Sequence, residues 1–172
     1  MIAQTGAGDV LKSSSLFVEF TSADLKELQS SLTTTHFAGG DVILGEGKAN
    51  RALHLLKSGR IRVTQNVEGK PVALCDLVAG QTFGELSIIE DGVASATLQA
   101  VTESDVLSIA MHDLSQFLKT HPDAAAKFWR AVAVDLRRRL LQTNDVVRNY
   151  FEVNRALVEN PKFREAYAMC NR

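Results

Sequence analysis

Cysteine, proline and long apolar runs are all scarce in this chain of 172 residues. The two cysteines, Cys75 and Cys170, are too few and too far apart for a disulfide framework or a zinc site. No apolar run reaches the roughly 18 residues that span a bilayer, and the N-terminus lacks the basic start and apolar stretch of a signal peptide. We therefore expect no membrane partner and a cytoplasmic location.

Signals for metal binding and for catalysis are missing as well. No two of the four histidines have the i, i+4 spacing of a metal site, so we expect no metal. The chain has no Gly-x-Ser-x-Gly, Walker or His-Glu-x-x-His motif, which predicts that it is not an enzyme and needs no cofactor. A formal net charge of −1 gives no overall attraction to nucleic acid. The content of 45% hydrophobic residues is that of a globular domain.

What is present divides the chain into stretches of different periodicity. Residues 1–15 are expected to be a flexible N-terminus. Residues 16–120 start with an amphipathic helix from Thr21 to Leu32, and then alternate with a period of two between His36 and Ile109. Glycine-rich turns separate the alternating segments, which is typical of an antiparallel sandwich or barrel. Cys75 lies in one of these segments and is expected to be a small core residue.

A helical period returns over residues 121–159, where Pro122 and Asp123 favour a helix start. Asn160-Pro161 is expected to end this helix and to begin a short terminal helix within residues 160–172. Within the long helix, residues spaced four and three apart form a heptad seam. This seam predicts a homodimer, since the stripe would otherwise face water. Its members are Trp129, Ala133, Leu136, Leu140, Thr143, Val147 and Tyr150.

The segment from Phe83 to Ala100 has the pattern of an anion-binding site. Gly84 permits a tight turn, and Glu85 to Ile89 can form one helical turn whose free N–H groups suit an anion. Three small residues on the following strand leave room for a ligand, namely Ala94, Ser95 and Ala96.

The chain resembles the cyclic nucleotide-binding domain family from about Leu16 to about Tyr150. The resemblance rests on three motifs: Phe37-x-x-Gly40-Asp41-x-Ile43-x-x-Glu46-Gly47, Leu53-x-Leu55-x-x-x-Gly59-x-Ile61-x-Val63, and Gly80-x-x-Phe83-Gly84-Glu85-Leu86. It implies an α+β fold that is mainly β, an antiparallel β-roll (jelly roll) flanked by N-terminal helices and a long C-terminal dimerisation helix. It also implies a regulatory module that binds cyclic AMP or cyclic GMP and couples occupancy of the pocket to that helix.

The resemblance gives roles to the matched positions of the phosphate-binding cassette. Glu85 matches the carboxylate that accepts a hydrogen bond from the ribose 2′-OH. The backbone turn that meets the cyclic phosphate is matched by Gly84, Leu86 and Ser87. Ser95 and Ala96 match the small residues after the arginine that pairs with the phosphate.

The phosphate arginine itself falls on Ala94, which is the main departure from the family. Loss of such a partner costs about 2–5 kcal/mol, so binding is expected to be weak or altered in specificity. Arg60 and Arg62 alternate with Ile61 and Val63, and are expected to point away from the pocket.

Two further positions and one alternative function stay open. Thr143 and Asn144 match residues that contact adenine in bacterial catabolite activators, yet a polar break in a heptad seam also sets register. The alternative to a sensor is a ligand-free dimeric scaffold that acts on an unidentified partner protein. A DNA-binding domain of about 60 residues does not fit into the 22 residues after Tyr150, so we expect no DNA binding by this chain.

Overall fold

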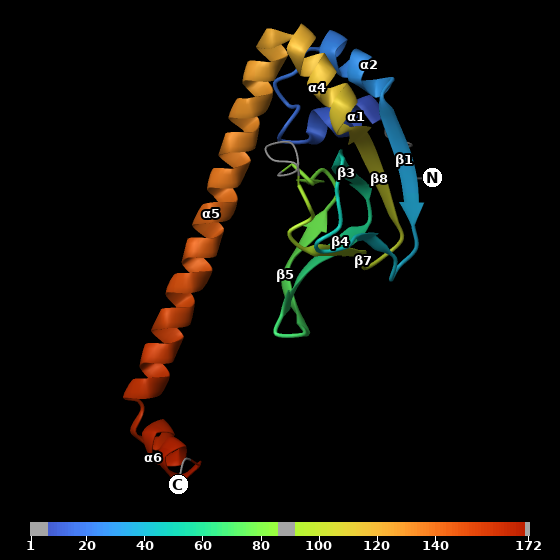
Figure 1. Ribbon diagram of the computed structural model, residues 1–172. Helices are drawn as coiled ribbons and strands as arrows, with labels where there is room; N and C mark the ends of the chain where they lie inside the picture. Colours follow the sequence, from blue (N-terminus) through green and yellow to red (C-terminus); the bar gives the residue numbers. More distant parts are fainter. Residues whose placement is uncertain (1–6, 86–91, 171–172) are drawn as a thin grey trace. The chain divides into compact units, whose positions relative to one another are not determined.

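The computed structural model describes residues 7–85 and 92–170 (Figure 1). Two compact units divide the chain, Met1–Val132 and Ala133–Arg172. The division falls inside the long helix α5 (Pro122–Glu159) rather than at its start. No helix among the described residues has both the length and the apolarity that a membrane crossing requires.

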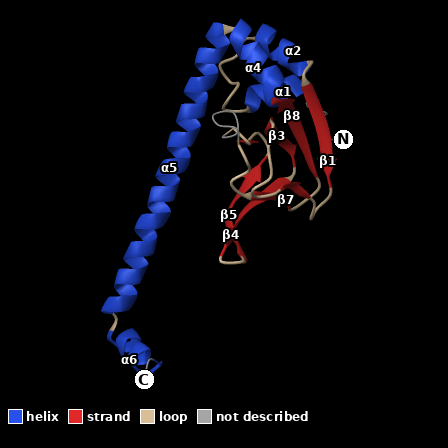
Figure 2. Ribbon diagram, in the orientation of Figure 1, coloured by secondary structure: helices blue, strands red, loops and turns tan. Residues whose placement is uncertain are grey.

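The described strands form two four-stranded antiparallel sheets, so the expected β-roll is confirmed (Figure 2). The first sheet has the order β1 (Leu32–Phe37), β8 (Ser104–Ala110), β3 (Ala52–Ser58) and β6 (Thr82–Phe83). The second has the order β2 (Val42–Leu44), β7 (Thr97–Ala100), β4 (Arg60–Val67) and β5 (Lys70–Val78).

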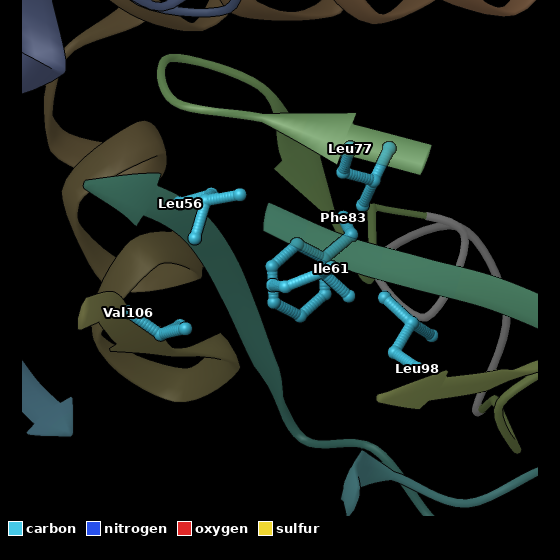
Figure 3. Close-up of a cluster of buried hydrophobic side chains, with 6 residues drawn as sticks. All are labelled: Leu56, Ile61, Leu77, Phe83, Leu98 and Val106. Carbon is cyan, nitrogen blue, oxygen red and sulfur yellow. The ribbon is translucent and has the colours of Figure 1, made fainter. Parts of the chain in front are cut away.

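Alternating apolar residues of both sheets form one core. Figure 3 shows its six buried members, Leu56, Ile61, Leu77, Phe83, Leu98 and Val106. On β4 the residues on either side of Ile61 face the other way, because side chains alternate along a strand. Arg62 Nε lies 2.8 Å from Asp76 Oδ1, and Arg60 Nε lies 3.9 Å from Asp76 Oδ2. Both arginines therefore point away from the interior, as the alternation predicts.

Cys75 is not a core residue, and this prediction was wrong. Its strand β5 is an edge strand, and only Leu77 is buried along it. Cys75 is exposed, as are Val72, Leu74 and Val78. An apolar run in a strand therefore does not by itself establish burial, because much of a folded protein's surface is apolar.

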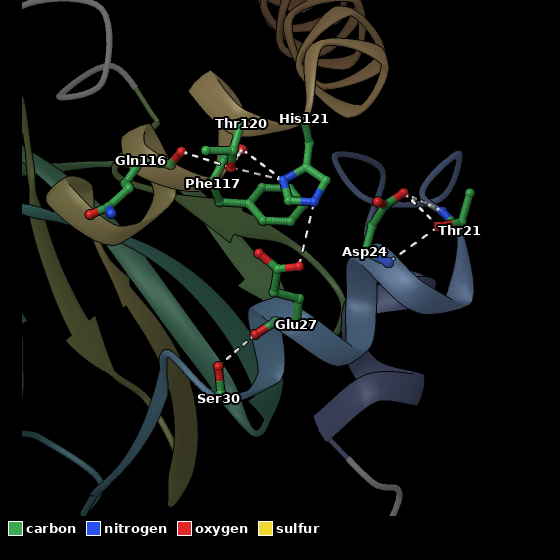
Figure 4. Close-up of polar contacts among 8 residues, drawn as sticks. All are labelled: Thr21, Asp24, Glu27, Ser30, Gln116, Phe117, Thr120 and His121. Atoms are coloured by element: carbon green, nitrogen blue, oxygen red, sulfur yellow. Dashed lines mark hydrogen bonds and ion pairs between the residues drawn. The ribbon is translucent and has the colours of Figure 1, made fainter.

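The N-terminal part differs from its prediction in two ways. Residues 1–15 were expected to be flexible, but α1 (Ala7–Ser13) is a helix whose Val10 and Leu11 are buried. Helix α2 (Ser22–Gln29) begins at Thr21, as expected, with a reciprocal capping box to Asp24 (Figure 4). It ends at Gln29, so Leu32 belongs to β1 and not to the helix.

The C-terminal helices begin with α4 (Met111–Thr120), which meets α5 at His121. His121 Nε2 lies 3.4 Å from Glu27 Oε2 of α2, and its ring stacks on Phe117 (Figure 4). The first turns of α5 bury Ala124, Phe128 and Val132. Asn160 Oδ1 accepts a hydrogen bond from Lys162 N at 3.0 Å and caps α6 (Pro161–Cys170), so the break at Asn160-Pro161 is confirmed.

The heptad seam of α5 is largely exposed in the chain by itself. Leu140 is 61% exposed and Tyr150 is 65% exposed, while Leu136 is half-buried. Large apolar side chains exposed along one helix are typical of a surface that contacts another protein. The homodimer stays a prediction.

Candidate ligand site

A turn at Gly84 and Glu85 follows β6 and opens the candidate site. Gly84 has φ +82°, a left-handed conformation that favours glycine. A Cβ on Gly84 would overlap the carboxamide nitrogen of Asn50 and would lie 2.9 Å from the main-chain oxygen of Ala52. The glycine is therefore required by both the backbone angle and the close approach of a neighbouring loop.

Gly84→Ala is expected to lower the free energy of unfolding by about 2–4 kcal/mol, because strain and overlap add. Gly69→Ala is the matched control, since Gly69 has φ +82° but no atom within 4 Å of its added Cβ. That control is expected to lose about 1 kcal/mol. Urea denaturation measures both, and an equal loss in the two variants would contradict the close approach at Gly84.

A buried polar network lies against Gly84. Asn50 is 6% exposed, and its Nδ2 donates to Ala52 O at 2.9 Å while its Oδ1 accepts from Ala52 N at 3.2 Å. His54 Nε2 lies 3.1 Å from the same Oδ1, so this nitrogen carries the proton and donates. His54 Nδ1 then accepts from the Ser108 hydroxyl at 2.8 Å.

His54 also contacts β6, the strand that leads into the turn. Its ring stacks on Phe83 with a centroid distance of 4.9 Å, and the two residues pair across β3 and β6. Burial lowers the pKa of His54 to about 4, well under its usual 6.5, because the charged ring is desolvated. His54 is therefore neutral at physiological pH.

Stability is expected to fall by up to about 3 kcal/mol as the pH drops from 6.5 to 4. In this window the unfolded chain binds a proton at His54 that the folded chain does not bind. His36, whose pKa is raised by its hydrogen bond to Asp105, acts in the opposite direction, but it is largely exposed. Denaturation of wild type and His54→Phe at pH 7 and pH 4.5 isolates the His54 effect. An unchanged pH dependence in His54→Phe would contradict it.

The segment from Gly92 to Ala96, which leads into β7, is held by the loop between β2 and β3. Gly47 N donates to Ala94 O at 2.8 Å, and Ala94 N donates to Lys48 O at 2.8 Å. Asn50 N donates to Gly92 O at 3.2 Å. Ala94, Ala96 and Leu98 are buried in alternation with exposed or half-buried residues, so the side chain at position 94 faces the interior.

The other predicted residues fall in three groups. Glu85 is 2% exposed and Ser95 is exposed. Leu86 and Ser87 lie outside the described residues. Thr143 and Asn144 lie on α5 in the second unit, where the Thr143 hydroxyl donates to Arg139 O at 3.0 Å and Asn144 is exposed.

Sequence reasoning missed Asn50 and His54. Asn50 lies two residues before β3, and His54 is the third residue of that strand. His54 alternates with Leu53 and Leu55, which are buried, and it therefore lies on the opposite face of β3. Nothing in the linear pattern shows that this face meets the cassette turn.

The chain belongs to the cyclic nucleotide-binding domain family, whose model matches residues 34–121. The matched region contains most of β1, the strands β2 to β8, the cassette turn and α4.

Relatives and a solved structure agree with this assignment. Glutaminase 1 of Bradyrhizobium diazoefficiens is 34% identical over 128 residues, which are 74% of this chain and 20% of that protein. Human cGMP-dependent protein kinase 2 is 32% identical over 103 residues, 59% of this chain and 13% of the kinase. The N-terminal domain of a transcriptional regulator from Streptomyces coelicolor A3(2) has a TM-score of 0.67 and 31% identity, covering 81% of this chain and 95% of that one. The chain thus spans a fifth or less of either relative's length.

Proposed function

We propose that this chain is a non-enzymatic regulatory module that binds a cyclic nucleotide weakly or with altered specificity. Occupancy of the β-roll is proposed to act on helix α5, and through it on an unidentified partner protein. The homodimer expected from the α5 seam belongs to the same proposal.

The observation that carries the proposal is the placement of Ala94. Its side chain faces the interior and is 7% exposed, and its main chain is fixed by two hydrogen bonds to the loop at Gly47 and Lys48. The backbone at position 94 is therefore in place, while the guanidinium that the family resemblance implies there is replaced by a methyl group. An interior that keeps its geometry but lacks one cation supports weak binding rather than loss of the fold.

A role in binding also fits the comparison with larger proteins. The matched part of glutaminase 1 is one fifth of that enzyme, as expected if this type of domain is one part of it. We propose that the present chain likewise regulates a partner and does no catalysis itself.

A thermal-shift screen tests the proposal. Cyclic AMP, cyclic GMP, a cyclic dinucleotide and ATP are each added up to about 10 mM. Binding to the native state with a dissociation constant near 100 μM would add about 2.7 kcal/mol of stability at that concentration. Saturable stabilisation by a cyclic mononucleotide is expected. No shift with any of the four would contradict the sensor and favour the ligand-free scaffold.

A further inference from the structure

We infer that Asn50 is a positioning residue that holds the two ends of the phosphate cassette together. The inference rests on the proposed function, since it gives the Asn50 side chain a role in forming that site. Asn50 lies in the loop between β2 and β3, outside the segment to which the family resemblance gives ligand contacts.

One end of the cassette is held by the Asn50 side chain. The carboxamide occupies the space that a Cβ on Gly84 would need, so the turn packs directly on it. The carboxamide itself is fixed by two hydrogen bonds to the main chain of Ala52, and its oxygen also accepts from His54 Nε2. Asn50 is therefore rigid where Gly84 rests on it.

The other end is held by the Asn50 main chain. Its N–H donates to Gly92 O, and the neighbouring residue Ala49 forms an isolated bridge with Val93. The chain leaves the turn at Glu85 and returns at Gly92, so one residue contacts both sides of the segment between them. A residue placed in this way sets the distance across the cassette without touching a ligand.

His54 extends this support to the β-roll. It connects Asn50 to Ser108 of β8 and stacks on Phe83, the residue before the turn. The ring of His54 is partly buried, which lowers its pKa to about 4, and the neutral ring is suited to a fixed structural hydrogen bond.

Asn50→Ala removes the carboxamide but leaves the main-chain N–H in place. Without the side chain, amide hydrogen exchange at positions 47, 50 and 94 is expected to become at least about tenfold faster, the effect of losing one hydrogen bond of typical strength. These are the amides that donate between the loop at residues 47–50 and the segment at residues 92–94. Amides of β8 are expected to change no more than in the control Thr21→Ala. That control removes the cap of α2 and lowers stability by about 1 kcal/mol elsewhere.

A second experiment measures cyclic nucleotide affinity in a protein that also carries Ala94→Arg, which places an arginine where the family resemblance implies one. The parent Ala94→Arg protein and its Asn50→Ala variant are compared at a temperature where both are folded. Asn50→Ala is expected to weaken cyclic AMP binding about tenfold there, and Thr21→Ala is expected to leave it unchanged. If Asn50→Ala does not fold, His54→Phe removes the hydrogen bond to Asn50 and keeps the stack on Phe83. It is expected to change exchange at the same positions in the same direction.

The outcomes separate the two proposals. Exchange that is unchanged at positions 47, 50 and 94, or that rises equally in β8, would overturn the role of Asn50. Faster local exchange in a parent protein that binds no cyclic nucleotide would leave the positioning role intact and contradict the proposed function instead.

Discussion

Ala94→Arg is expected to tighten cyclic AMP or cyclic GMP binding by about 30-fold to 5,000-fold. The range corresponds to the 2–5 kcal/mol that one partner of a desolvated charge pair is typically worth. The side chain at position 94 faces the interior, and the buried carboxylate of Glu85 belongs to the same cassette. A guanidinium can pair with a phosphate through two parallel hydrogen bonds. Isothermal calorimetry on wild type and mutant measures the gain.

Ser95→Arg is the matched control for this prediction. It adds the same charge one residue further on, but Ser95 is exposed and its side chain points out of the interior. We expect the control to change affinity by less than about threefold, because an exposed charge is screened. Low-micromolar binding by wild type with no gain in Ala94→Arg would show that another residue pairs with the phosphate. An equal gain in both variants would show that net charge, not the position, is responsible.

Leu136→Glu combined with Leu140→Glu is expected to convert a dimer into a soluble monomer. Both residues lie in the predicted seam, and burying two carboxylates in an apolar contact costs several kcal/mol. The control Val134→Glu with Leu141→Glu introduces the same two charges on the same helix, at two positions seven residues apart. Val134 and Leu141 are 49% and 46% exposed and lie outside the heptad seam.

Light scattering at about 100 μM protein decides between the outcomes. The seam variant is expected to be monomeric, while wild type and the control remain dimeric. A monomeric wild type would contradict the dimer itself. Dissociation of the control to the same extent as the seam variant would place the contact on another face of α5.

The strands and the helix caps were predictable because their signals are local. The alternation of Arg60 and Arg62 with Ile61 gave the correct faces of β4, and Asn160-Pro161 gave the end of α5. The alternation of a strand and the cap of a helix depend on neighbouring residues alone, so both can be predicted without knowing the rest of the fold.

The predictions that failed, and the residues that were overlooked, depend on tertiary contacts. Helix α1 is only seven residues long, so it is stabilised by the burial of Val10 and Leu11 in the folded chain rather than by its own helix propensity. Cys75 lies in an apolar strand that turned out to be an edge. The Asn50–His54 network joins a loop, a strand and the cassette turn, and no spacing along the chain encodes that meeting.

The candidate site was predictable in part. The pattern Phe83-Gly84-Glu85 predicted a turn that needs glycine, and φ at Gly84 agrees with it. The three small residues from Ala94 to Ala96 predicted room for a ligand, whereas the interior orientation of Ala94 and the loop that holds it come from the structure.

The central claim is that a cyclic nucleotide occupies the β-roll and that its binding acts on α5. Hydrogen exchange of the full chain, with and without about 10 mM cyclic AMP or cyclic GMP, tests both halves in one measurement. The account predicts slower exchange at residues 82–85 and 92–97, accompanied by a change in α5 between residues 129 and 150. Identical exchange in both segments with and without either nucleotide would contradict it.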